Sequence, residues 1–322
     1  MFVLTSKIEI GDYTFNSVHE VEIVKSVEEL SDTAVIKFPS KFKIKKDGSL
    51  KYTEEALKVN DKVTITLGYE GKYEGVEFTG YVSSIGSKIP LEIKCEDSMW
   101  LLRRKNINKA FNEKTTLKAI LQEVVSGTEI QLADNNPEIK IDKYIVKNAN
   151  GTQVLQKLKE EYALSIYLND EGKLYAGLQQ ANNIGQEAIY DLNYNLVENN
   201  LEYKSADQKR IKVRYECRDK ANKVIRVELG DQDGELREMK LNNVFDEPTL
   251  REMAEAALKA AKYDGFEGSV KSFLLPFATR GMAAKIVDSE HPNREGKYFI
   301  KKVTTTFGTD GARRSIEIAN KL

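Results

Sequence analysis

The stretch that most constrains the fold covers residues 91–106, LEIKCEDSMWLLRRKN, because the periodicity of the chain changes within it. Its first six residues alternate between apolar and charged, with Leu91, Ile93 and Cys95 on one face. This period of two is typical of a half-buried strand. The dense apolar group that follows does not keep that period, so the strand must end and the chain must turn.

The turn is formed by an acidic pair, Glu96 with Asp97, and by an apolar pair, Trp100 with Leu101. The side chain of Asp97 or of Ser98 is able to accept hydrogen bonds from the free N–H groups at the start of a helix. We therefore predict a structural corner from strand to helix, in which the one tryptophan of the chain fills a gap between two layers. Glu96 and Asp97 are interpreted as corner and cap rather than as a catalytic pair.

Residues 1–97 form a succession of short segments with strand periodicity, separated by turn residues. The clearest is Lys62–Tyr69, KVTITLGY, in which Val63, Ile65 and Leu67 alternate with polar residues. Short strands joined by tight turns favour a small antiparallel β-barrel or sandwich over a parallel α/β sheet. We predict that residues 1–97 are a first β-barrel domain.

Helical periodicity appears directly after the corner, at residues 115–125 and again in the segment that starts at Gly151, and a short hairpin follows. We interpret residues 98–188 as a mixed α+β insertion. Strand patterns resume in residues 189–322, interrupted by one helix at about 249–263. The predicted fold is therefore mainly β, with two small antiparallel β-barrels bracketing a mixed helical and β domain.

Composition excludes several classes of protein. The chain has 322 residues, 41% of them hydrophobic and 31% charged, with a formal net charge of −1, which argues against a disordered tail and a dedicated nucleic-acid binder. Cys95 and Cys217 lie in strand-like runs, and with His19 and His291 they make no metal-ligand pattern, so we expect reduced thiols, no metal and no cofactor. No apolar run is long enough for a membrane span, which predicts a soluble protein folded in a reducing cytoplasm.

Enzymatic interpretations find little support in the sequence. It contains no glycine-rich phosphate loop and no G-x-S-x-G elbow. Adjacent carboxylates at Glu28 with Glu29 and at Glu160 with Glu161 keep a hydrolase open, but fifty acidic residues make such pairs common. The basic run within residues 41–46 is explained by a solvated edge or a subunit contact, since no base-stacking motif accompanies it. We expect no catalytic residues.

Three segments in fixed order, VNDKVTITLGYEG, FTGYVSSI and LEIKCEDSMWLLRRK, resemble the hub proteins of contractile phage tails, the late control D family. They are also similar to the hub-like N-terminal part of the type VI secretion spike protein VgrG. The family's ED--WLL motif matches at the four corner residues, while Asn60 stands where the family has glycine. The C-terminal segment from GMAAKIVD to RRSIEI resembles the closing barrel of the family, with Phe307 where a histidine is common.

This resemblance implies a structural baseplate hub. The chain would form a homotrimer, each copy contributing two related tail-tube-like barrels to a pseudo-sixfold ring. That ring would contact the tail tube protein on one side, a separate trimeric spike protein on the other, and further baseplate components, within a virion tail assembled in the bacterial cytoplasm. Lys62–Tyr69 and residues 209–217 are candidates for its lumen or interface faces.

Two alternatives to the hub stay open. A tail-associated cell-wall or polysaccharide hydrolase would need paired carboxylates in a cleft. An adaptor that binds carbohydrate or another protein as a monomer would show no self-association.

Overall fold

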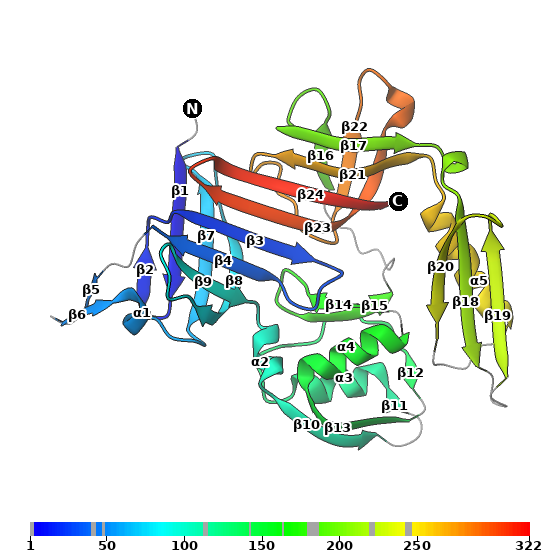
Figure 1. Cartoon of the computed structure of the whole chain (residues 1–322), viewed down its shortest axis with the longest axis horizontal. Coiled ribbons are helices and arrows are strands. Elements are labelled where there is room, and N and C mark those ends of the chain that lie inside the picture. The colour runs from blue at the N-terminus through cyan, green and yellow to red at the C-terminus, as the bar shows by residue number, and fades with distance from the viewer. Residues whose placement is uncertain are drawn as a thin grey trace.

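A computed structural model describes residues 3–39, 43–46, 49–111, 115–141, 143–162, 164–178, 187–218, 223–241 and 247–322. Within these residues strands far outnumber helices, which confirms the prediction of a mainly β chain (Figure 1). The described helices include none that is long and apolar enough to cross a membrane.

The region before the corner is built from strands and one short helix. In chain order these are β1 (Leu4–Ile10), β2 (Tyr13–Phe15), β3 (Glu20–Ser26), β4 (Thr33–Phe38), β5 (Lys43–Lys46), β6 (Ser49–Tyr52), α1 (Thr53–Ala56), β7 (Lys62–Tyr69), β8 (Tyr73–Ile85) and β9 (Leu91–Glu96). Gly11 has a φ of +55° in the turn between β1 and β2, a conformation that glycine adopts at little cost.

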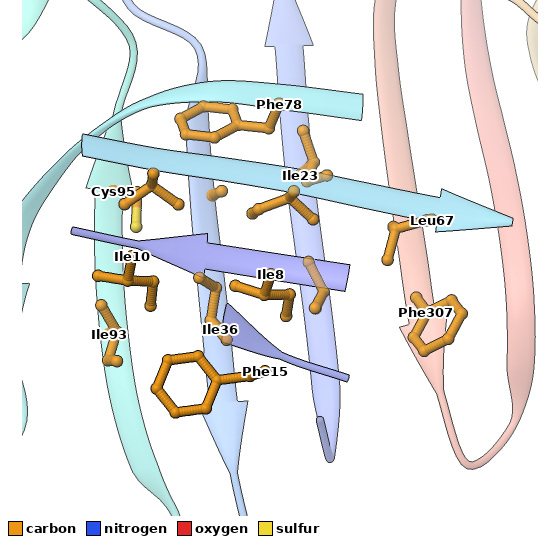
Figure 2. Close-up of a cluster of buried hydrophobic side chains, with 14 of the residues drawn as sticks. Ile8, Ile10, Phe15, Ile23, Ile36, Leu67, Phe78, Ile93, Cys95 and Phe307 are labelled. Carbon is orange, nitrogen blue, oxygen red and sulfur yellow. The ribbon is translucent and has the colours of Figure 1, made fainter. Parts of the chain in front are cut away.

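The strands of this region curl around one hydrophobic core. In Figure 2, β1 and β7 cross in front of β3 and β4, and apolar side chains from both layers fill the space between them. Ile8 and Ile65, which are opposite each other on β1 and β7, are both fully buried. Because alternate residues of a strand point to opposite faces, the period of two in the sequence supplies one apolar face per strand to this core.

The α+β module follows the corner. Its elements are α2 (Met99–Arg103), β10 (Asn106–Phe111), β11 (Thr115–Thr116), α3 (Leu117–Val125), β12 (Lys140–Ile141), β13 (Tyr144–Asn150), α4 (Gly151–Tyr162), β14 (Leu164–Leu168) and β15 (Leu174–Leu178). Leu121 of α3 and Leu155 of α4 are fully buried in a second core, together with Ile166 of β14. The Thr116 hydroxyl caps α3 by accepting a 3.2 Å hydrogen bond from the Ala119 amide.

The remaining elements are β16 (Glu187–Asp191), β17 (Glu198–Lys204), the 3-10 helix η1 (Ala206–Gln208), β18 (Ile211–Arg218), β19 (Val224–Gly230), β20 (Glu235–Lys240), α5 (Glu247–Ala261), β21 (Gly265–Ser272), β22 (Ala283–Val287), η2 (Pro292–Arg294), β23 (Gly296–Gly308) and β24 (Gly311–Lys321). Strands β18, β19 and β20 form a small sheet of their own, against which α5 packs through Leu250 and Ala254. Residues 209–217, proposed above as a lumen or interface strand, therefore fall mostly in this separate sheet.

One sheet joins the first and last regions. It contains 13 of the described strands in the order β17-β21-β24-β23-β3-β4-β9-β8-β7-β1-β2, with β22 on β23 and β16 on β22. The joining pair is β23 with β3, where Val303 lies opposite Lys25 and Phe307 opposite Val21. Phe307 and Ala312 of the last hairpin are buried in the first core.

Because β23 pairs with β3, the two predicted barrels are not present as separate closed barrels among the described strands. In the pairing of the described strands neither region closes on itself by a backbone ladder. The physical reason is that β23 takes the edge of β3, which a closed first barrel would have used for its own last strand. Each region still curls around its own core, and in the first region side-chain contacts link β7 and β8 to β24.

Candidate functional site

The four predicted corner residues lie where β9 ends and α2 begins. Glu96 is the last residue of β9, and its carboxylate pairs with Arg103 at 2.7 Å. Asp97 is buried, whereas Trp100 and Leu101 are only half-buried. The structure thus keeps the corner in place but leaves the tryptophan at its surface.

Trp100 is therefore not the buried plug that we predicted. Met99 and Leu102 of α2 are both fully buried and fill that role. Residues three apart share one face of a helix, so the pair that faces the core leaves Trp100 on the opposite side. There its indole N–H donates a 2.8 Å hydrogen bond to Asn60 Oδ1, in the loop before β7.

Asp97 supplies the cap, and Ser98 makes no side-chain capping bond. Asp97 Oδ1 accepts a 2.9 Å bond from the Met99 amide, and Oδ2 accepts a 2.9 Å bond from the Asp32 amide between β3 and β4. The Asp97 amide in turn donates to the Asp32 carbonyl at 3.0 Å. These bonds fix the corner to the β3–β4 turn.

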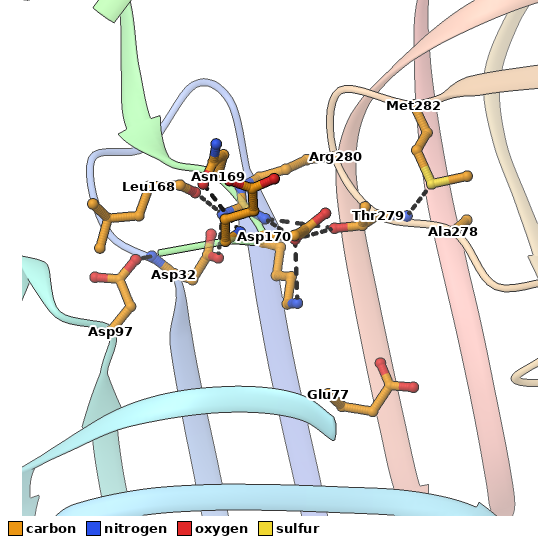
Figure 3. A network of polar contacts seen from close by, with 12 residues as sticks. Asp32, Glu77, Asp97, Leu168, Asn169, Asp170, Ala278, Thr279, Arg280 and Met282 are labelled. Carbon is orange, nitrogen blue, oxygen red and sulfur yellow. Dashed lines mark hydrogen bonds and ion pairs between the residues drawn. The ribbon is translucent and has the colours of Figure 1, made fainter. Parts of the chain in front are cut away.

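Arg280 completes an ionic cluster with Asp32, Asp97 and Asp170 (Figure 3). The Arg280 side chain is 2% exposed and lies 2.8 Å from the Asp32 carboxylate and 3.1 Å from the Asp170 carboxylate. It also donates to the Leu168 carbonyl. Since Asp170 and Leu168 belong to the β14–β15 hairpin and Asp32 to the sheet, this guanidinium links the module to the sheet.

Burial changes the acidity of the two inner carboxyls of this cluster. Desolvation raises the pKa of Asp97 to about 8 and that of Asp32 to about 6, from 3.8. The negative charge of Asp32 adds to the rise in the Asp97 pKa, while the guanidinium of Arg280 limits the rise in the pKa of both. The side chains of Asp32 and Asp97 are both buried, whereas a general acid has to come within hydrogen-bond distance of its substrate.

A second buried ion pair joins β24 to β8, two strands of the curled sheet that are not neighbours in its strand order. Arg314 of β24 and Glu77 of β8 are 1% and 2% exposed and are separated by 2.6 Å. Arg314 also donates to the Ala278 carbonyl at 2.7 Å, and the Tyr73 hydroxyl donates to Glu77 at 2.6 Å. Close by, the Tyr69 hydroxyl donates to the Ala312 carbonyl at 2.8 Å. We call this set of contacts between β7–β8 and β24 the seam.

One extended segment, residues 273–282, runs past both polar groups. Its inward residues include Leu274 and Ala278, which are buried, and Arg280 of the ionic cluster. Its outward residues include three large apolar side chains that are 36 to 43% exposed: Phe273, Leu275 and Phe277. The guanidinium groups of Arg313 and Arg314 lie 4.8 Å from the ring centres of Phe273 and Phe277. The exposed parts of these three neighbouring apolar residues make the segment a candidate contact surface.

No pattern in the sequence indicated that Arg280 is buried, and only a partial signal indicated that Arg314 is. In β24, Arg314 occupies an inward position of the period of two, between Ala312 and Ile316, which are buried. A charged residue at an apolar position of a regular strand pattern indicates a buried ion pair. The partner of that residue is identified only when the three-dimensional fold is known.

The acidic pairs considered for a hydrolase lie at the surface. Glu28, Glu29 and Glu160 are exposed, and Glu161 is half-buried and pairs with Lys157 at 3.6 Å. Among the described residues there is no group of three or more histidine, cysteine or carboxylate side chains placed to hold a metal.

Comparison with known proteins identifies solved structures that have a similar fold. No protein-family model matches the sequence, and no curated protein matches it either. Solved structures do match. The 43 kDa tail protein of prophage MuSo2 from Shewanella oneidensis superposes with a TM-score of 0.66 over 98% of both chains, at 15% identity. The tail protein from Neisseria meningitidis MC58 gives 0.65, covering 99% of this chain and 97% of the other, at 14% identity.

Type VI secretion proteins share the fold as well. The E. coli c3393 protein, a component of the type VI secretion system, gives a TM-score of 0.61 over 97% of this chain and 76% of its own, at 10% identity. A chain of the Francisella PdpA-VgrG complex gives 0.59, with 98% of this chain covering 57% of the other, at 12% identity. The chain therefore has a fold found in phage tail proteins and in type VI secretion proteins. The predicted likeness to both groups is confirmed for the fold, and membership of the late control D family stays a prediction.

Proposed function

We propose that this chain is a structural baseplate hub of a contractile phage tail or a related injection machine. The observation that carries the proposal is the likeness of fold to two tail proteins over nearly the whole length of all three chains. The hub would join a hexameric tail tube to a separate trimeric spike and would make or break no covalent bond. In a phage it would be located in the virion tail, after assembly in the bacterial cytoplasm.

The joined sheet supports a ring with pseudo-sixfold symmetry. Each chain offers two curled β regions that share one sheet through β23 and β3. A cyclic homotrimer of such chains would present six similar regions to a sixfold tube, although the two regions of each chain are not identical. The two regions would play the part of the tail-tube-like barrels, without the closed ladder of each.

The outward face of the joined sheet suits the wall of a lumen. On this face Thr306 of β23 lies opposite Arg313 of β24 and opposite Glu22 of β3. Polar side chains thus continue from one region to the other, while the inward face of the same strands is mainly apolar, with Thr305 and Arg314 as buried exceptions. A tube wall needs one packed side and one hydrated side, so we propose that the polar side lines the lumen.

We propose that the apolar stripe of Phe273, Leu275 and Phe277 is covered by a neighbouring copy in the trimer. To test this, Leu275 is changed to serine and Val224, 39% exposed on the separate sheet, is changed to serine as a matched control. Leu275→Ser is expected to weaken self-association about tenfold or more, because an exposed leucine that becomes buried in an interface loses its hydrophobic contribution. Val224→Ser is expected to associate like wild type.

The oligomeric state tests the hub most directly. Mass photometry and analytical ultracentrifugation of the chain, alone and mixed with its tube and spike proteins, are expected to show a trimer. Electron microscopy of the assembly is expected to show a ring of six β regions from three chains. A chain that stays monomeric in all mixtures would overturn the hub and favour the monomeric adaptor.

The hydrolase alternative receives no specific support from the geometry, because its candidate carboxylates are on the surface. We propose a non-enzymatic role. Release of soluble fragments from purified peptidoglycan by the assembled protein, abolished by Glu160→Gln, would contradict it.

A further inference from the structure

The α+β module contacts the rest of the chain mainly through polar groups. The buried residues of its core all lie between Met99 and Ala176, and among the described residues the sheet region adds the half-buried Leu30. Polar contacts surround this one apolar contact. Glu129 of the module accepts hydrogen bonds from Tyr81 at 2.6 Å and from Lys62 at 3.1 Å. A body with a complete core of its own and a polar boundary opens at lower cost than a shared core.

Arg280 is the most buried of these boundary groups. Its partners on the module are the Asp170 carboxylate and the Leu168 carbonyl, and its partner on the sheet is Asp32. Thr279, the preceding residue, donates its hydroxyl to Asp170 at 3.0 Å. Two consecutive residues of one segment therefore hold the β14–β15 hairpin.

The same segment holds the seam. Leu274 is fully buried in the first core, and its amide donates to the Tyr69 hydroxyl at 3.3 Å. Four residues further on, the Ala278 carbonyl accepts the bond from Arg314, the partner of Glu77. Only one residue separates Ala278 from Arg280, so a short length of backbone joins the ionic cluster to the seam.

We propose that residues 273–282 couple the contacts between the α+β module and the sheet to the contacts of the seam. Weakening either set of contacts would then weaken the other. This inference goes beyond the structural role proposed above, and it concerns the single chain whether or not that chain trimerises. Its physical basis is that a buried charge is costly when its pairing is incomplete. If the 46%-exposed Asp170 withdraws, the 2%-exposed Arg280 keeps only Asp32 as an ionic partner. Withdrawal of Asp170 alters the setting of Arg280, and the tightly packed segment passes the displacement on.

Hydrogen–deuterium exchange of the full chain, read by mass spectrometry, tests the coupling. The first variant is Asp170→Asn, which removes the carboxylate that pairs with Arg280 and keeps a residue suited to the hairpin turn. Its matched control is Asp134→Asn, another module carboxylate in an ion pair, with Lys173 at 3.3 Å, whose side chain is 94% exposed. Thr279→Val, which removes the second contact with Asp170, serves as an independent variant.

Asp170→Asn and Thr279→Val are expected to speed exchange about threefold to tenfold in two places, the hairpin peptide 164–178 and the seam peptides 69–78 and 311–316. Peptide 117–125 inside the module core is expected to exchange at the wild-type rate, and Asp134→Asn is expected to match wild type throughout. In the reverse direction, Tyr73→Phe removes the hydroxyl that donates to Glu77 and is expected to speed exchange in peptide 164–178.

Three outcomes would overturn the proposal. Faster exchange in the hairpin with an unchanged seam would show that docking and closure are independent. Unchanged exchange in both places would show that Asp170 does not hold the module. Uniformly faster exchange, including peptide 117–125, would show general destabilisation instead of coupling.

Discussion

The buried pair of Arg314 and Glu77 gives the sharpest stability prediction. Replacing Arg314 by methionine, which keeps an unbranched apolar stem but removes the guanidinium, leaves the 2%-exposed Glu77 carboxylate without its cation. The Ala278 carbonyl loses its donor at the same time. Withdrawing one partner of a buried pair costs about 3 to 5 kcal/mol, because the remaining charge is neither hydrated nor paired.

The surface of the same protein supplies a control. Arg226 and Glu216 pair at 2.9 Å across β19 and β18, but the Arg226 side chain is 53% exposed. Exposed pairs contribute about 0 to 1 kcal/mol, since water and salt screen them. Arg226→Met is therefore expected to lower the free energy of unfolding by at most about 1 kcal/mol.

Urea denaturation followed by circular dichroism measures both variants, together with Glu77→Leu and the double variant Glu77→Leu/Arg314→Met. The double variant buries no lone charge, so it is expected to be less destabilised than the sum of its single changes by about 2 kcal/mol or more. The reasoning would be refuted if Arg314→Met were no more destabilising than Arg226→Met, or if the two changes were additive.

Three further predictions follow from burial, from acidity and from backbone geometry. Leu102→Ala is expected to cost about 2 to 5 kcal/mol and Trp100→Ala clearly less, because only Leu102 is fully buried; equal losses in urea denaturation would contradict this. The pKa values of Asp32 and Asp97 are raised in the folded state, so the protonated carboxyls stabilise the fold fully below about pH 4. This contribution is lost as the pH rises through about 6 for Asp32 and about 8 for Asp97. The free energy of unfolding of the wild-type chain is therefore expected to fall relative to that of Asp97→Asn between pH 5 and pH 8. If the difference in unfolding free energy between the two proteins did not depend on pH, this prediction would be wrong. Gly268→Ala is expected to lower the melting temperature by several degrees, since φ there is +117° and a Cβ would lie 2.2 Å from a backbone oxygen of the neighbouring strand; an unchanged melting temperature would refute it.

Local periodicity predicted the elements of this fold well. Strand β7 covers the predicted Lys62–Tyr69, and α3 lies within the stretch 115–125 that has helical periodicity. These features depend on residues close in sequence, whose spacing directly determines which face each side chain joins.

The pairing between strands far apart in the chain could not be predicted from the sequence. Nothing in the alternation of β3 distinguishes β23 from any other strand as its neighbour, because a period of two fits every such partner equally. The interpretation of Trp100 failed for a related reason. Size and apolarity favoured a buried tryptophan, but in the five-residue helix α2 the core takes the face of Met99 and Leu102.

The pairing of β3 with β23 also determines the order in which the protein is able to fold. Strand β3 leaves the ribosome long before its partner β23 is synthesised. Until then β3 has an open edge, and the first core lacks Phe307 and Ala312. The α+β module draws its core almost entirely from one continuous stretch of chain, so it is able to fold first. The joined sheet is completed only when β23 is available, and any delay before then prolongs the time for which the unpaired edge of β3 is open to other chains.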